Sequence, residues 1–277
     1  MPELPEVETV VRSLRRGGLS GVTLRGARVS WPRSVHGMTP ATFIRRLRGA
    51  RIRRCRRRGK FIVLDLQDGR ALLIHLRMTG HLRLALAEQP RDPHDRVAIA
   101  LDDGRELRLR DTRKFGRVYL VAAAAGPLGR LGPEPLGARF TCAGFQASLR
   151  LRGRRLKPLL LDQAFLAGLG NIYVDEALWE AGLHPLRRAS ALAPAEARRL
   201  FVAIRCVLRR GIRNRGTSLG TGRTNFAAAD GRFGRNQQQV RVFRRTGRPC
   251  PRCGTPIRRL IVGQRSTHIC PVCQPRG

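Results

Sequence analysis

The spacing of the apolar residues changes once along this chain, and that change most constrains its fold. Before residues 126–137 apolar and polar residues alternate, which predicts strands that each bury one face. After that segment the apolar residues recur at helical spacing. The segment itself contains four glycines and three prolines, a composition typical of a linker. We therefore expect an α+β protein with a β-rich first half and a helical second half.

Asp-Gly dipeptides join two pairs of strand-like segments in the first half, and this is a strong hairpin signal. Residues 60–66 and 70–76 flank Asp68-Gly69, and residues 97–101 and 105–110 flank Asp103-Gly104. In the last segment leucines alternate with Arg108 and Arg110, which predicts one buried and one basic face. Residues 116–122 add a further strand. The first half should therefore be mainly antiparallel sheet.

Helical patterns appear at the beginning of the chain and in its second half. Apolar positions in residues 7–14 predict a short helix. Leu200, Ile204, Val207 and Leu208 mark a long helix that Gly211 begins to end. Residues 216–234, rich in glycine and polar residues, should form a mobile loop.

The C-terminal region carries two Cys-x-x-Cys pairs separated by sixteen residues, Cys250/Cys253 and Cys270/Cys273. This spacing allows two tight turns to bind one tetrahedral Zn²⁺. Disulfides are the alternative, and a cytosolic setting disfavours them. Four thiolates leave no open coordination position, so we expect a structural zinc and no catalytic metal. The remaining cysteines, Cys55, Cys142 and Cys206, are expected to be buried packing residues.

The charge balance indicates a polyanionic partner. The 55 basic and 19 acidic residues give a formal charge of +36, and a positive surface gains affinity for nucleic acid by releasing counterions. No long apolar run or basic amphipathic segment indicates a membrane. The acidic N-terminus lacks a signal-peptide stretch, so a cytoplasmic location is expected. Among the basic residues only Lys60, Lys114 and Lys157 are lysines, which indicates either chance survival or a need for a compact ammonium.

The first eight residues place three of the acidic residues, Glu3, Glu6 and Glu8, beside Pro2. If Met1 is removed, Pro2 carries a secondary amine, which can attack a sugar carbon and form an iminium ion. A neighbouring glutamate could act as general acid or base. The alternative is an ordinary helix start, in which Pro5 and early glutamates suit the first turn.

Three further motifs each allow a structural and a functional interpretation. Gly170-Asn171 precedes a helix through Glu176 and Trp179, and it suits either a plain cap or phosphate binding. Met78 and Phe115 could be core residues or exposed wedges that fill the gap left by an extruded base. Arginines 258, 259 and 265, on a hairpin between the cysteine pairs, could contact phosphate or simply be solvated.

Together these motifs resemble the bacterial formamidopyrimidine-DNA glycosylases over essentially the whole chain. The matching motifs are the opening residues 1–8, Arg58-Gly59-Lys60, residues 75–80, residues 113–116, residues 160–163, residues 168–173 and the four-cysteine finger. The resemblance implies a base-excision repair enzyme with coupled lyase activity on oxidised purines such as 8-oxoguanine and formamidopyrimidines. It implies an N-terminal β-sandwich and a helix-two-turn-helix domain ending in a zinc finger, with DNA in the cleft between them.

The resemblance also assigns roles to individual residues. Pro2 is the nucleophile at C1′, Glu3 its acid/base partner, and Glu6 helps to shape the site. Lys60 and Arg265 complete the catalytic group, with Lys60 contacting DNA near the lesion and Arg265 binding phosphate. DNA is also bound by His94, Arg113, Lys157 and Asn171, and the void opposite the flipped base is filled by Met78, Arg113 and Phe115. The implied domains are residues 1–125, a linker at 126–140, the helical domain at 141–240 with its lesion-capping loop, and the finger at 241–277.

The capping loop departs from the family pattern. Residues 220–224 look like a short insertion, and Arg235-Asn236 stand where an aromatic or small residue is more usual. Two other functions therefore stay open, an endonuclease VIII-like preference for oxidised pyrimidines and a non-catalytic zinc-finger protein that binds damaged DNA. In each case we expect a monomer that binds damaged double-stranded DNA, located in the bacterial cytoplasm and associated with the nucleoid.

Overall fold

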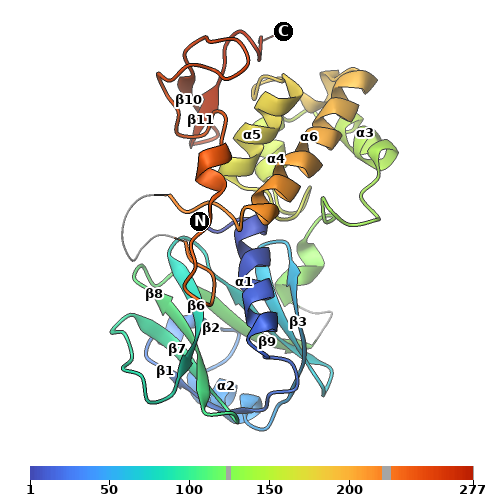
Figure 1. Ribbon diagram of the computed structural model, residues 1–277. Coiled ribbons are helices and arrows are strands. Elements are labelled where there is room, and N and C mark those ends of the chain that lie inside the picture. The colour runs from blue at the N-terminus through green and yellow to red at the C-terminus, as the bar shows by residue number, and fades with distance from the viewer. Residues whose placement is uncertain (123–125, 220–225, 277) are drawn as a thin grey trace. The chain divides into compact units, whose positions relative to one another are not determined.

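The computed structural model describes residues 1–122, 126–219 and 226–276, which form two compact units (Figure 1). The first unit comprises Met1–Gly129 and Asn214–Gln237, and the second comprises Arg130–Arg213 and Gln238–Gly277. The segment Asn214–Gln237 thus packs with the N-terminal unit, whereas the sequence-based division placed it in the helical domain. The reason lies in its hydrogen bonds, one of which is donated to Glu6 near the N-terminus.

Two sheets build the first unit, as the alternating pattern predicted. The four-stranded sheet has the order β1 (Leu24–Val29), β7 (Asp95–Leu101), β8 (Arg105–Asp111), β6 (Gly80–Leu86). The five-stranded sheet has the order β2 (Val35–His36), β9 (Arg117–Ala122), β5 (Arg70–His75), β4 (Phe61–Leu66), β3 (Ile52–Arg58). All described pairings are antiparallel except that of β2 with β9. Both predicted Asp-Gly hairpins are confirmed.

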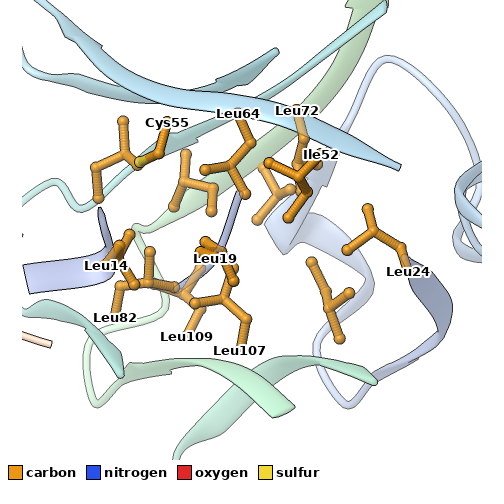
Figure 2. Close-up of a cluster of buried hydrophobic side chains, with 14 of the residues drawn as sticks. Leu14, Leu19, Leu24, Ile52, Cys55, Leu64, Leu72, Leu82, Leu107 and Leu109 are labelled. Atoms are coloured by element: carbon orange, nitrogen blue, oxygen red, sulfur yellow. The ribbon is translucent and has the colours of Figure 1, made fainter. Parts of the chain in front are cut away.

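Leucine-rich faces of the two sheets enclose one core, so the unit is a β-sandwich (Figure 2). Leu64 and Leu72 come from the five-stranded sheet, and Leu82 and Leu107 come from the other. Leu14 of the first helix inserts between them. Each of these side chains is almost fully buried, and such burial stabilises a folded chain by roughly 1.5–3 kcal/mol per leucine. The sandwich is therefore a rigid base for the turns at its edges.

Helix α1 (Leu4–Arg16) is longer at both ends than the predicted residues 7–14. Proline in its first turn and Glu6 at its third position favour an early start. One face buries Leu4, Val7, Val10, Val11 and Leu14 in the sandwich core. The second helix of this unit, α2 (Pro40–Leu47), is capped by the Thr39 hydroxyl. Short 3₁₀ turns occur at η1 (Pro32–Ser34) and η2 (Gly126–Arg130).

The predicted basic face of β8 is wrong at Arg108, whose side chain is completely buried. Its guanidinium donates to the backbone carbonyls of residues 86, 87, 89 and 90 and pairs with Glu106. Arginine has five donors and can satisfy several carbonyls at once, so its burial is tolerated here. The residue that alternation assigned to solvent instead fixes the segment between β6 and β7.

The second unit is mainly helical. It contains α3 (Cys142–Arg150), α4 (Leu156–Leu161), α5 (Asn171–Ala181) and α6 (Pro194–Arg213), with 3₁₀ turns η3 (Ala189–Ala191) and η4 (Asn236–Gln239), the latter beginning in the first unit. The hairpin of β10 (Arg258–Val262) and β11 (Arg265–Ile269) follows, as predicted. None of the helices in the described ranges is long and apolar enough to span a membrane.

Gly211 lies inside α6 and does not end it. A Cβ at this position would come within 2.6 Å of the Tyr173 ring on α5, so glycine permits the close approach of the two helices. The expectation for the three scattered cysteines holds only in part, since Cys55 is buried, Cys142 is half-buried and Cys206 is exposed. Cys206 lies on the outer face of α6, away from the buried stripe that contains Ile204 and Val207.

Candidate active site

The N-terminal proline lies in a buried position beside two carboxylates. Pro2, Glu3 and Glu6 are all buried, with Glu3 2% and Glu6 1% exposed, whereas Met1 is 47% exposed. Glu3 caps α1, and its backbone N–H donates to Oε2 of Glu6 at 2.9 Å. The fold of the first helical turn therefore places both carboxyl groups near the residue whose nitrogen becomes the N-terminus when Met1 is removed.

Glu6 also holds the segment that surrounds the undescribed residues 220–225. Its Oε1 accepts the backbone N–H of Thr217 at 2.7 Å. Gly216 has a φ of +80°, and a Cβ there would lie 2.9 Å from Cγ of Glu6, so only glycine fits. Beyond the gap, Asn236 donates to the Thr217 hydroxyl at 2.9 Å, and Ser218 accepts from the Gly234 N–H at 2.8 Å. The predicted insertion at 220–224 lies outside the described residues.

Lys60 occupies the tight turn between β3 and β4 and is only 5% exposed. His75, at the end of β5, lies nearby; it belongs to the motif of residues 75–80, whose resemblance implies no role for this histidine. Burial, reinforced by the cations Arg77 and Lys60, lowers the pKa of His75 to about 3. Its Nδ1 accepts the backbone N–H of Arg77 at 3.0 Å, so the neutral ring keeps its proton on Nε2. His75 is therefore a neutral donor over the whole physiological pH range.

Met78 and Phe115 project from two turns at the edge of the sandwich and are 42% and 44% exposed. The alternative that they are core residues is therefore wrong. Met78 lies between β5 and β6, and Phe115 lies between β8 and β9. The exposed Arg113 guanidinium stacks over the Phe115 ring, 4.9 Å from its centre. We call these the wedge turns, residues 76–80 and 111–116.

His94 is oriented by Asp92. Oδ1 of Asp92 accepts the His94 backbone N–H at 2.8 Å and lies 2.9 Å from Nδ1 of its ring. Partial burial raises the pKa of Asp92, but the hydrogen bonds from Arg110 and His94 outweigh it and hold that pKa well below its usual range. The ring is half-exposed, with Nε2 as its remaining polar atom, so His94 can meet a ligand.

Lys157, Asn171 and Arg265 belong to the second unit, in which Lys157 is completely buried. The Lys157 side chain is 0% exposed, and its Nζ lies 2.5 Å from Oδ1 of the equally buried Asp175. It also donates to the Ser266 carbonyl, which accepts the Asn171 side-chain amide as well. In this structure the Lys157 ammonium is thus enclosed by protein groups, and its contact with a phosphate stays a prediction.

Arg265 is exposed, whereas Asn171 is half-buried. Asn171 begins α5, and its Oδ1 is buried without a hydrogen-bond partner in the structure. Arg265 is exposed and follows the Gly263-Gln264 turn, in which both residues have positive φ. Asp175 joins the two elements, because its Oδ2 accepts the His268 backbone N–H of β11 at 3.0 Å. The N-terminal part of α5 and the β10–β11 hairpin are thereby fixed to each other.

The four cysteines form a complete zinc-binding set. Their sulfur atoms lie within 4.8 Å of one another, and all four thiols are unpaired by disulfides. Tetrahedral Zn–S bonds of about 2.3 Å require sulfurs about 3.8 Å apart, close to the 3.9 Å between Cys250 and Cys273. The Trp179 indole N–H lies 3.4 Å from the Cys250 sulfur and can stabilise a thiolate. The donor set fits a structural zinc with no open position.

Comparisons with known proteins agree with this geometry. Residues 1–118 match the formamidopyrimidine-DNA glycosylase N-terminal domain, residues 131–222 its H2TH domain, and residues 247–276 a zinc finger found in FPG and IleRS. The formamidopyrimidine-DNA glycosylase of Protochlamydia amoebophila is 47% identical over 276 residues, covering all of both chains.

Two solved structures extend the likeness to three dimensions. The MutM (Fpg) protein of Thermus thermophilus superposes with a TM-score of 0.89 at 42% identity, covering all of both chains. The Lactococcus lactis Fpg (MutM) complex with Fapy-dG-containing DNA superposes with a TM-score of 0.89 at 35% identity, covering 99% of this chain and all of that one.

Proposed function

Because this chain belongs to the formamidopyrimidine-DNA glycosylase family, we propose that Pro2, freed by loss of Met1, attacks C1′ of a damaged nucleotide. The chain is a DNA glycosylase of base-excision repair with the lyase activity of that family. The observation that carries the proposal is the burial of Pro2 beside the Glu3 and Glu6 carboxyl groups. A secondary amine in such a position is a nucleophile with a proton carrier at hand.

The proposed reaction has two stages. In the first, the Pro2 nitrogen bonds to C1′ while the bond from C1′ to the base breaks, and the base leaves with the electron pair and takes up a proton. The C1′–O4′ bond of the sugar then breaks while the Pro2 nitrogen loses its proton and O4′ takes one up, which leaves an iminium ion between Pro2 and C1′. In the second stage the iminium withdraws electrons, so C2′ loses a proton and the 3′ phosphate leaves. A further elimination releases the 5′ phosphate. Glu3 supplies and removes the protons.

Glu6 and Lys60 support this chemistry from positions next to the N-terminus. Glu6 accepts N–H groups from Glu3 and from Thr217, so it fixes the first turn of α1 relative to the capping segment. We propose that Lys60 contacts DNA close to the lesion, because a compact ammonium in a tight turn can approach a phosphate or a sugar oxygen. His75, held neutral, adds a donor whose strength does not change with pH.

The wedge turns explain how the sugar could reach Pro2. Extruding a nucleotide costs a few kcal/mol of stacking and pairing energy. Side chains that fill the resulting void offset part of that cost. Met78, Arg113 and Phe115 are exposed and project from turns at the edge of the sandwich, where they could fill such a void. We propose that they occupy the void opposite the flipped base, and that His94, Asn171 and Arg265 bind the DNA backbone.

The substrate we propose is damaged double-stranded DNA that contains 8-oxoguanine or a formamidopyrimidine. A Lactococcus lactis relative has been solved with Fapy-dG-containing DNA, which supports this lesion class. We propose that the protein acts as a monomer. We place the protein in the bacterial cytoplasm on nucleoid DNA, in keeping with its charge of +36.

Borohydride trapping tests the proposed nucleophile. With an abasic-site duplex, the wild-type protein should give a covalent adduct whose intact mass shows a chain that lacks Met1. Pro2→Gly should lose the adduct, and so should a variant that retains Met1. Pro5→Ala is the matched control, since it removes a proline from the same helical turn but leaves the terminal amine. A chain that keeps Met1 and still traps at the wild-type rate would refute the assignment.

The same assay separates the remaining functions. A non-catalytic damage-binding protein would bind the duplex but give no adduct. An endonuclease VIII-like enzyme would trap but would cleave a thymine glycol duplex faster than an 8-oxoguanine duplex.

A further inference from the structure

The two wedge turns share one buried carboxylate, that of Asp111, which is 1% exposed. Oδ1 accepts the Thr79 hydroxyl at 2.5 Å, from the turn that carries Met78. The same oxygen accepts the Arg113 backbone N–H at 3.2 Å, and Oδ2 accepts the Gly116 N–H at 2.6 Å. These two groups flank Phe115. A single side chain is therefore hydrogen-bonded to both turns.

The backbone of Asp111 extends this connection to a third group. Its N–H donates to the His94 carbonyl at 2.9 Å, and its carbonyl accepts from the Arg96 guanidinium at 2.8 Å. Segments that are distant in the sequence thus meet at one residue. Two direct hydrogen-bond partners of Asp111, His94 and Arg113, are residues that the proposed function assigns to DNA. The other two such residues, Met78 and Phe115, lie next to its partners Thr79 and Gly116.

Both wedge turns need such an anchor because their backbones are strained. Arg77 and Lys114 have φ values of +53° and +61°, a left-handed conformation that is unfavourable for residues other than glycine. Gly80 has no room for a side chain, since a Cβ would lie 2.4 Å from the Leu76 carbonyl oxygen. Strained turns persist only where surrounding contacts hold them. The Asp111 carboxylate supplies such contacts to both turns, and the hydrogen bond from the Arg77 N–H to Nδ1 of His75 adds another to the first turn.

We propose that Asp111 is a positioning residue and that its hydrogen bond with the Thr79 hydroxyl makes the two wedge turns act as one unit. Met78 and Phe115 then enter the DNA together, and losing either one reduces what the other contributes. This inference rests on the proposed function, because it assumes that both side chains enter the duplex. The test therefore changes Thr79, whose hydroxyl links the two turns. A change of Asp111 would also remove the hydrogen bonds within residues 111–116.

A double-mutant cycle tests the coupling without any chemical step. The affinity for a duplex with a tetrahydrofuran abasic analogue is measured for Met78→Ala, Phe115→Ala and the combined variant. The cycle is run in the wild-type background and in Thr79→Val, which keeps the shape of the side chain but removes the hydroxyl. In the wild-type background, the fold-loss of affinity of the combined variant should differ at least fivefold from the product of the two single fold-losses. In the Thr79→Val background this difference should be less than twofold.

Two controls make the result specific. Thr79→Ser restores the hydroxyl and should restore the coupling, while Thr42→Val removes a surface hydroxyl on α2 and should leave it unchanged. Should circular dichroism show that Thr79→Val is unfolded, Thr79→Ala takes its place. Equal coupling with and without the hydroxyl, or none in the wild type, overturns the proposal. Failure of the proposed chemistry would appear separately, as absence of borohydride trapping in the wild type.

Discussion

Replacing Lys157 by methionine should weaken DNA binding while leaving the number of phosphate contacts unchanged. Lys157 and Asp175 are both 0% exposed and 2.5 Å apart. Removing one partner of a buried ion pair costs about 3–5 kcal/mol of stability, because the other charge stays buried. The Ser266 carbonyl, which also accepts from Asn171, loses one of its two donors. The helix start and the hairpin turn should therefore be less well aligned toward DNA.

The salt dependence of binding distinguishes this positioning role from direct contact. Each neutralised phosphate contributes about −0.9 to the slope of log K against log salt concentration. We expect Lys157→Met to lower the affinity with an unchanged slope, whereas Arg265→Ala should make the slope shallower by about 0.9. Urea titration of each variant shows the loss of stability and confirms that the protein is folded under the binding conditions. A slope for Lys157→Met that matches the Arg265→Ala slope would refute the reasoning.

Buried groups also determine the stability of the protein and the surroundings of Trp179. Gly211→Ala should destabilise the protein by about 1–3 kcal/mol in urea titration, because its Cβ would overlap the Tyr173 ring; an unchanged midpoint would contradict the packing. His75 has a folded pKa of about 3, so the unfolded state binds the extra proton. Stability should therefore be fully present above the unfolded pKa of about 6.5 and fall by about 2 kcal/mol by pH 5, a loss absent from His75→Gln. Each chain should release one zinc ion, measured with a chromogenic chelator. Loss of this zinc should change the fluorescence of Trp179, because its indole contacts Cys250, and unaltered emission would contradict that contact.

Local sequence signals were sufficient for much of the fold. Asp-Gly dipeptides identified the β4–β5 and β7–β8 hairpins because that turn type depends on two residues alone. The cysteine spacing identified the finger for the same reason. In contrast, β3 was not predicted, because arginine occupies most of its positions and hides the alternation, as its sequence Ile-Arg-Arg-Cys-Arg-Arg-Arg shows. Strand β3 forms because it pairs with the fully buried β4, and that information lies outside its own residues.

The positions of the charged side chains were the least predictable feature of the site. Spacing along a strand assigned Arg108 to solvent, and the family resemblance assigned Lys157 to a phosphate. Both are completely buried, because backbone carbonyls or a carboxylate from distant segments satisfy their donors. Such partners are visible only in three dimensions.

Four buried carboxylates of this basic chain also find their partners in the folded structure. Glu6, Asp111, Asp175 and Glu176 are each at most 2% exposed, and each accepts backbone N–H groups from a segment distant in sequence or from a tight turn. An ionised carboxylate has several acceptor sites and no donor, so it can hold several N–H groups where an amide could hold fewer. Burial raises the pKa of Glu176, yet three consecutive N–H groups, those of residues 241–243, still converge on it. In a protein whose surface must stay positive to bind DNA, an acidic residue does least harm inside. There Asp111 and Asp175 anchor segments that carry side chains we propose to bind DNA.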